Sequence, residues 1–239
     1  MDARWALRTA VRASPPPPSH VNAARCVTMV SMDIDRTSGL TLMERRKEET
    51  RLSISYCAAT LFADADTEPV TAEFIAKSAG VGLRTFYRYF RTKEDAVAPL
   101  LEDGARRWIR LIMDAPAEVP IGIVLENTTR QALTEPATPF ESIDLVHRVL
   151  CSMGNNPALL SVWLRVVNDT ELLLVSVLKR RLKPDTDPFA IQMLAVAANT
   201  AQRMAVEVWM DADNKATEIT DPATIAVRCI RTLTAGIEI

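Results

Sequence analysis

The sequence contains few of the residues that phosphate loops, metal sites and catalytic centres need. Only 7 of its 239 residues are glycine, and the two histidines, His20 and His147, lie far apart. The motifs G-x-S-x-G, G-x-G-x-x-G, H-E-x-x-H and the phosphate-binding loop are absent. Gly80-Val81-Gly82 does not complete a dinucleotide fingerprint, and it joins two predicted helices where a strand is required. We therefore expect no enzyme activity, no cofactor and no metal.

The cysteine pattern gives no sign of a zinc ribbon or a redox motif. No C-x-x-C occurs, and the four cysteines are widely spaced: Cys26, Cys57, Cys151 and Cys229. We interpret them as reduced thiols in a cytoplasmic protein.

No segment is apolar enough to predict a membrane span. The most apolar stretch, residues 159–178, is interrupted by Arg165, Asp169 and Glu171 among others. We expect no membrane partner.

Helical periodicity dominates the rest of the chain. With 48% hydrophobic and 24% charged residues, the composition is that of a globular protein, and the apolar residues recur at helical spacing. Asn156-Pro157, Asp187-Pro188 and Asp221-Pro222 each place a capping residue before a proline, which indicates helix starts. The pattern predicts an all-α fold with helices at about residues 42–63, 72–78, 82–89, 93–113, 121–133, 140–152, 157–182, 188–210 and 222–237.

Residues 1–42 have a different character, with a proline run at 15–18 and no hydrophobic period. We expect a disordered extension that the fold does not need. Its arginines loosely suggest a transit peptide, but it has no apolar core segment. A translation start at Met32 or Met43 is an alternative.

Residues 71–90 contain the most informative pattern, two short helices joined by a tight turn at Gly80. Glycine adopts the left-handed conformation that ends a helix without a Cβ clash. The second helix has an inner face and an outer face that carries Leu83, Arg84, Tyr87 and Arg88. The expected core of this helix-turn-helix is Ile75, Ala76, Ala79, Gly80, Val81, Phe86 and Phe90.

Local charge supports contact with DNA, although the whole chain carries a net charge of −2. Residues 82–93 contain Arg84, Arg88, Arg91 and Lys93 and no acidic residue. A local basic patch of this kind binds phosphates, and arginine also reads guanine edges in the major groove.

The same stretch resembles the DNA-binding domain of TetR-family (tetracycline-repressor-like) transcriptional regulators. The resemblance covers about residues 45–101 and rests on these elements: Leu61-Phe62, Ile75-Ala76, Ala79-Gly80-Val81, Thr85-Phe86-Tyr87, Tyr89-Phe90 and Thr92-Lys93-Glu94. It departs from the family at Asp66, at the usually polar position of Phe74, and at Gly82, where a capping serine is usual.

The resemblance implies that the second helix of the motif enters the major groove. Thr71 is added as a capping residue and Arg88 from the outer face of the helix, so the predicted DNA-binding residues are Thr71, Leu83, Arg84, Thr85, Tyr87, Arg88, Tyr89 and Lys93. Leu83 and Arg84 would read bases, and Lys93, at the start of the next helix, would contact the backbone.

For the remainder, the resemblance implies a helical effector-binding and dimerisation domain. We divide the chain into the extension 1–42, a DNA-binding domain 43–103 and an effector domain 104–239. Candidate pocket residues are Trp108, Phe140, His147, Trp163 and Met204, and the alternative, which the composition favours, is that each packs in the core. Apolar residues of the last two helices would either pair with a second copy or fill the monomer core. The expected function is a homodimeric repressor that is released from its DNA operator by a small-molecule effector; a regulator without an effector, or one that binds another protein, is the alternative.

Overall fold

The computed structural model describes residues 41–64, 69–134, 143–210 and 221–237. The predicted disorder of 1–42 and the candidate Phe140 lie outside this part, except for Thr41 and Leu42. Helices make up the described residues, with no strand among them, so the all-α prediction is confirmed. In chain order they are α2 (Leu42–Ala63), α3 (Ala72–Ser78), α4 (Leu83–Tyr89), the 3-10 helix η3 (Asp95–Val97), α5 (Ala98–Asp114), α6 (Ile121–Thr134), α7 (Ile143–Ser152), the 3-10 helix η4 (Met153–Asn155), α8 (Pro157–Arg181), α9 (Pro188–Met210) and α10 (Pro222–Thr234).

Capping residues set the starts of several helices. The side chain of Asn156 accepts a hydrogen bond from the backbone N–H of Leu159, and Asp221 accepts from two backbone N–H groups at the start of α10. Thr41 and Glu44 form a capping box at α2 that we did not predict. Such caps satisfy backbone donors that would otherwise lack a partner.

The predicted helix at 93–113 is wrong in its first turns. Thr92, Lys93 and Glu94 lie in a bend and turn, and η3 precedes α5, which begins only at Ala98. The hydroxyl of Thr92 does accept from the backbone N–H of Asp95 at 3.0 Å, but it caps a 3-10 turn. The predicted start at 82 and the predicted end at 237 also differ from the structure, in which these helices start at Leu83 and end at Thr234. The predicted start at 140 lies outside the described residues.

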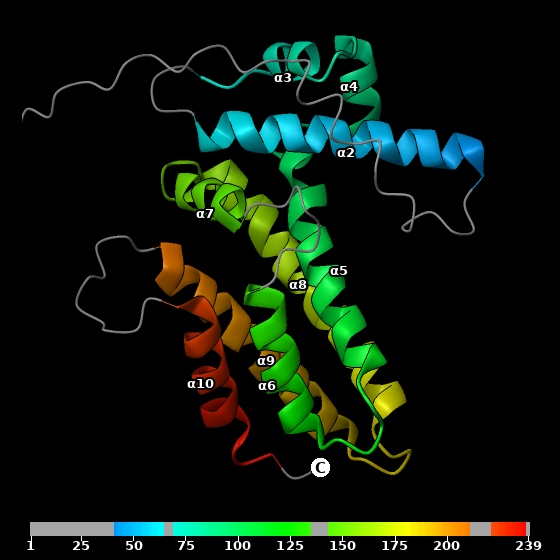
Figure 1. The fold of residues 1–239 in the computed structure, drawn as a ribbon, viewed down its shortest axis with the longest axis vertical. Helices are drawn as coiled ribbons and strands as arrows, with labels where there is room; N and C mark the ends of the chain where they lie inside the picture. The colour runs from blue at the N-terminus through cyan, green and yellow to red at the C-terminus, as the bar shows by residue number, and fades with distance from the viewer. Residues whose placement is uncertain (1–40, 65–68, 135–142, 211–220, 238–239) are drawn as a thin grey trace, which may run out of the picture.

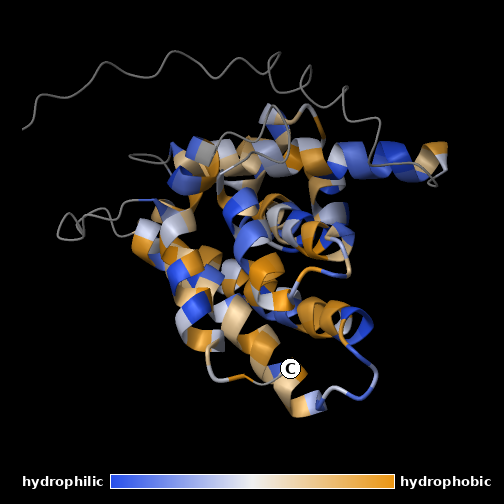
Figure 2. Cartoon of the chain, turned by 60° about the horizontal axis from the view of Figure 1, so that its bottom comes forward, coloured by the Kyte–Doolittle hydropathy of each residue, from blue (hydrophilic) through white to orange (hydrophobic). Residues whose placement is uncertain are grey.

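Figure 1 shows α2 lying across one end of the molecule, with α3 and α4 on its outer side and the other helices on its inner side. The first half of α2 is hydrophilic apart from its tip and projects beyond its neighbours (Figure 2). The buried side chains of α2 begin only at Ile54. The helix therefore supports the helix-turn-helix with its second half.

Two groups of buried side chains form the interior, and α5 contributes to both. The first group joins α2, α3 and α4 to α7 and the start of α8, and includes Phe86 and Leu100. The second lies among the lower part of α5, α6, α8, α9 and α10, and includes Trp108 and Leu194. The core of the helix-turn-helix thus continues into the helices that follow it. No helix among the described residues is long and apolar enough to span a membrane.

Candidate nucleic-acid interface and cavity

The turn between α3 and α4 has the backbone geometry that its glycine permits. Gly80 has φ +67°, in the left-handed region. The N–H groups of Gly80 and Val81 donate to the carbonyls of Lys77 and Ala76 at 3.1 and 2.9 Å, which closes the end of α3. At its start, Thr71 accepts from the N–H of Phe74 at 3.1 Å.

Six of the seven predicted core residues of the motif are buried or partly buried, whereas Gly80, in the turn, is exposed. Ile75 and Phe86 are fully buried, and Phe90 is 6% exposed, with the two phenylalanine rings 5.6 Å apart. Ala76 and Ala79 are buried beside them, and Val81 is partly buried. This core fixes α4 against α3, so the opposite face of α4 points outward.

That outer face is exposed and basic. Leu83, Arg84, Tyr87 and Arg88 are exposed, and Arg91 continues the surface beyond the helix. The guanidinium carbon of Arg88 lies 5.3 Å from the ring centre of Tyr89, so Arg88 packs along the helix surface. Arg84 is in the first turn of α4, where a side chain of a groove-bound helix reaches base edges.

Lys93 is held more firmly than the sequence suggests. Its Nζ donates to the backbone carbonyl of Val70 at 2.7 Å and lies 3.7 Å from a carboxylate oxygen of Glu94. Lys93 therefore ties the segment before α3 to the turn before η3, and any phosphate contact has to share its ammonium group with Val70.

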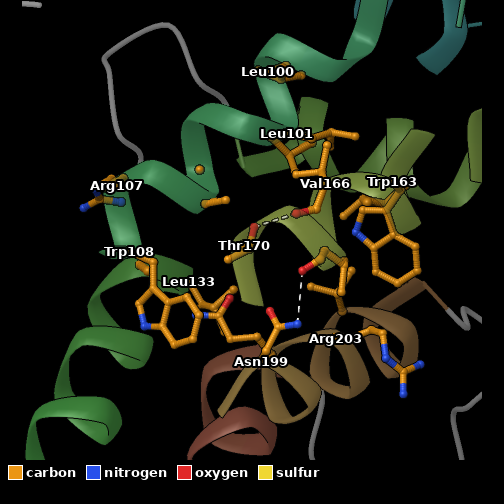
Figure 3. Close-up of a pocket in the computed structure, with 18 of the residues that line it drawn as sticks. Leu100, Leu101, Arg107, Trp108, Leu133, Trp163, Val166, Thr170, Asn199 and Arg203 are labelled. Atoms are coloured by element: carbon orange, nitrogen blue, oxygen red, sulfur yellow. Dashed lines mark hydrogen bonds between the residues drawn. The ribbon is translucent and has the colours of Figure 1, made fainter. Parts of the chain in front are cut away.

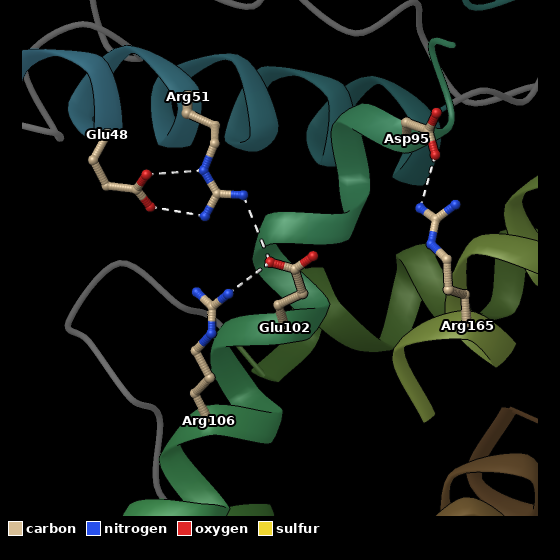
Figure 4. A network of polar contacts seen from close by, with 6 residues as sticks. All are labelled: Glu48, Arg51, Asp95, Glu102, Arg106 and Arg165. Carbon is tan, nitrogen blue, oxygen red and sulfur yellow. Dashed lines mark hydrogen bonds and ion pairs between the residues drawn. The ribbon is translucent and has the colours of Figure 1, made fainter. Parts of the chain in front are cut away.

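Ion pairs join the helix-turn-helix to the helices below it, as Figure 4 shows. Arg51 of α2 pairs with Glu48 at 2.8 Å and with Glu102 of α5 at 3.6 Å. Burial alone would lower the pKa of Arg51, but the bonds to Glu48 and Glu102 hold that pKa above its usual value. Arg165 of α8 donates to Asp95 of η3 at 2.8 Å.

A cavity of about 190 Å³ lies between α5, α6, α7, α8 and α9, on the inner side of the helix-turn-helix. Its lining is mainly apolar, and Trp108 and Trp163 lie toward opposite sides of it in Figure 3. The polar residues of the lining are Arg107, Thr170, Asn199, Gln202 and Arg203. This composition, apolar walls with a few polar groups, is typical of small-molecule sites.

Comparison with known proteins agrees with the geometry of the helix-turn-helix. Residues 57–98 match the profile of the family described as bacterial regulatory proteins, tetR family. The chain carries the TetR-family DNA-binding domain. The matched segment runs from the second half of α2 through α3, α4 and η3. No curated protein sequence matches the chain.

Solved structures with a similar chain trace include three regulators. One is a TetR-family transcriptional regulator from Streptomyces coelicolor, with 18% identity, 79% of this chain and 80% of that one covered, and a TM-score of 0.45. Another is the fatty acid degradation regulator FadR from Bacillus halodurans, with 20% identity, 79% and 96% covered, and a TM-score of 0.47. The third, a TetR-family regulator from Mesorhizobium loti, has 17% identity, 80% and 97% covered, and a TM-score of 0.48.

The predicted DNA-binding residues lie at the N-cap of α3, along α4 and in the turn that follows α4. Tyr89, Thr85 and Lys93 are partly buried, whereas Thr71 is exposed. The contacts of these residues with DNA remain predictions.

The predicted pocket residues separate into two groups. Trp108 and Trp163 line the cavity. His147 lies outside the lining: its ring stacks on Trp209 with centres 4.3 Å apart, and its Nε2 lies 3.0 Å from the backbone oxygen of Trp209. Met204 is 39% exposed and does not line the cavity either.

Sequence reasoning missed Trp209 and Arg165. Trp209 lines the cavity from the last turn of α9, where hydrophobic periodicity does not distinguish it from a core residue. The pair of Arg165 with Asp95 joins residues 70 positions apart, and no local pattern signals such a contact.

Proposed function

We propose that this regulator is a repressor, released from its operator when a small molecule binds in the cavity. The supporting observation is that the cavity shares helices with the DNA-binding domain. Leu100 of α5 belongs both to the core that holds α4 and to the cavity lining. A ligand that moves α5 therefore also moves the helix-turn-helix.

Two further links run from the cavity to the DNA-binding domain. Val146 and Leu150 of α7 line the cavity, and Arg148 on the same helix pairs with Asp64 at the end of α2. Trp163 of α8 lines the cavity two residues before Arg165, whose partner is Asp95 of η3. The proposal needs only that ligand-bound and ligand-free states differ in how they place α4.

We also propose a homodimer that binds two half-sites in the bacterial cytoplasm, because one helix-turn-helix contacts few base pairs. Such a dimer represses by occupying a promoter, so the proposal includes no catalytic step. The outward face of α9 suits the interface, since Phe189, Met193 and Met204 lie on one stripe and are 70%, 41% and 39% exposed. In contrast, Ile191 and Leu194 are buried in the monomer.

The dimer is tested with two matched variants. Met193→Glu places a charge on the outward face of α9, and Met113→Glu places the same charge on α5, where Met113 is 51% exposed. Light scattering should give about twice the chain mass of 26.4 kDa for the wild type and for Met113→Glu, and a monomer for Met193→Glu. A dimeric Met193→Glu would place the interface elsewhere, and a monomeric wild type would exclude the dimer.

Repression is tested with an operator selected from random DNA by the purified protein. A reporter promoter that overlaps this operator should be silenced by the wild type. Silencing should be lost in Arg84→Ala, whose side chain is exposed on the outer face of α4. Activation of the reporter by the bound wild type would contradict the repressor role.

A further inference from the structure

We infer that the cavity binds a molecule with an apolar body and a carbonyl-type oxygen, either a carboxylate or a neutral carbonyl, that accepts hydrogen bonds from Nε1 of Trp108 and Nε2 of Gln202. The inference rests on the proposed effector function and specifies the chemistry of the ligand. Its basis is a pair of buried donors without partners in a cavity whose lining is mainly apolar.

Both donors are buried, and neither has a partner in the described part of the protein. Nε1 of Trp108 and Nε2 of Gln202 each have almost no solvent exposure and no hydrogen-bond partner. Both residues line the cavity, Trp108 from α5 and Gln202 from α9, and Trp108 is only 1% exposed. A buried donor without an acceptor is unfavourable, so a ligand that supplies an acceptor gains binding free energy.

The neighbouring polar side chains of the lining already have protein partners. The hydroxyl of Thr170 donates to the carbonyl of Val166 at 2.7 Å. Nδ2 of Asn199 donates to the carbonyl of Val167 at 3.1 Å, as Figure 3 shows. The donors of Trp108 and Gln202 have no such partner, and they favour an acceptor over a further donor. Because neither nitrogen is exposed, a ligand oxygen reaches them only when neighbouring side chains shift on binding.

The charged residues of the lining disfavour a cationic ligand. No aspartate or glutamate is among the lining residues, and the two charged residues there are Arg107 and Arg203. Figure 3 shows their guanidinium groups at the periphery of the lining, with the apolar side chains between them. An ammonium group inside the cavity would lose its hydration without gaining a counter-ion, which is costly.

The test compares four probes that share a phenylpropyl body. They are 4-phenylbutanoate, 5-phenylpentan-2-one, the hydrocarbon (4-methylpentyl)benzene and 4-phenylbutylamine. Calorimetry and thermal shifts on the full chain should show the acid or the ketone binding at least tenfold more tightly than the hydrocarbon, and the amine binding most weakly. The acid and the ketone together show whether the acceptor has to be charged.

Two variants assign the effect to the donors. Gln202→Leu keeps the approximate size of the side chain and removes its amide. It should lower the affinity for the acid or the ketone, whichever binds more tightly, about five- to tenfold, and should change the affinity for the hydrocarbon by less than twofold. Gln192→Leu, on the exposed side of α9, is the matched control and should change neither. Trp108→Phe should repeat the effect of Gln202→Leu if it folds, which its melting temperature reports.

The outcomes separate the inference from the function on which it rests. If the hydrocarbon or the amine binds as tightly as the acid and the ketone, or if Gln202→Leu changes nothing, the inferred chemistry is wrong while the effector cavity stands. If none of the four probes binds, both the inferred chemistry and the effector role of this cavity are overturned.

Discussion

Gly80 and Gly82 flank Val81 in the turn of the helix-turn-helix, and their backbones differ in the sign of φ. The same substitution made at each glycine tests the effect of this difference. Gly80 has φ +67°, whereas Gly82 has φ −73° and ψ 151°, a conformation open to every residue. A Cβ atom added at either glycine meets no heavy atom within 4 Å. Steric clash is therefore absent at both positions, and backbone strain is the main difference between them.

The same substitution at both sites gives the magnitude of this strain. Serine in the left-handed region costs roughly 1–2 kcal/mol. Gly82→Ser restores a side-chain cap at the start of α4, where Gly82 provides none, and should gain a few tenths of a kcal/mol. The loss of unfolded-state entropy is common to both variants and cancels in the comparison. Gly80→Ser should thus be less stable than Gly82→Ser by about 1–2 kcal/mol.

Thermal and urea denaturation of the two variants measure the difference. For a chain of this size, about 1–2 kcal/mol corresponds to a gap of roughly 2–8 °C in Tm. Gly80→Asn should recover part of the loss, because asparagine tolerates the left-handed region. Equal stability of Gly80→Ser and Gly82→Ser would refute the argument that the turn requires a left-handed residue at position 80.

Three further substitutions test the DNA-facing surface and one helix cap. Arg84→Ala should weaken binding to the selected operator by about 1–3 kcal/mol and relax the base preference at one position. An equal loss of affinity for scrambled DNA would contradict the placement of α4 in the major groove. Lys93→Ala should weaken binding to all DNA sequences alike and reduce the slope of log affinity against log salt concentration by about one per subunit. An unchanged slope would show that Lys93 bonds to Val70 and does not contact a phosphate. The pKa of Asp221 is lowered, first by the hydroxyl of Thr224, so its cap stabilises the fold above about pH 4 and is lost as the pH falls through that lowered pKa. Asp221→Ala should therefore cost about 1 kcal/mol at pH 7, and a cost that persists at pH 2 would contradict the role of the carboxylate.

The helices were predictable where local signals specify their ends. The Asn-Pro and Asp-Pro pairs gave the starts of α8, α9 and α10, and the turn at Gly80 gave the end of α3. The start of α5 was not predictable in the same way. Thr92 is a good capping residue, and a 3-10 turn and an α-helix begin with the same local signals. In the 3-10 helix η3, Ala96 and Val97 are buried in the same core as the side chains of α2. This tertiary packing is not visible in the local sequence.

The candidate DNA interface was more predictable than the cavity. The inner and outer faces of α4 follow from spacing alone, because Phe86 and Phe90 have to be buried. The cavity is formed by side chains from five helices, so no single periodic pattern marks it. His147 illustrates the limit: an isolated histidine looked like a pocket residue, yet its ring packs on Trp209 from another helix.

The ion pair between Arg165 and Asp95 gives the last prediction, which concerns the coupling between the cavity and DNA. Asp95 lies in η3, between α4 and α5, and Arg165 follows Trp163 and precedes Val166, both of which line the cavity. The pair is partly exposed, with the side chains of Arg165 and Asp95 54% and 19% accessible, so its loss should change stability by about 1 kcal/mol or less.

Loss of the pair between Arg165 and Asp95 should affect the coupling between ligand binding and operator affinity more than it affects stability. Arg165→Ala removes one of the contacts that transmit a movement of α8 to η3, so the ligand-induced loss of operator affinity should fall by roughly 0.5–2 kcal/mol. The measurement is operator affinity with and without the tightest-binding probe of the phenylpropyl series.

A matched pair provides the control. Arg231 of α10 donates to Glu126 of α6 at 2.6 Å, and neither helix contributes to the core that holds α4. Arg231→Ala should leave the coupling at its wild-type value. A double-mutant cycle with Asp95→Ala should also show that Arg165→Ala has no further effect once Asp95 is gone. Equal coupling in Arg165→Ala and Arg231→Ala would mean that the signal reaches α4 through α5 and α7 alone, because those helices connect the cavity to the DNA-binding domain independently of Arg165.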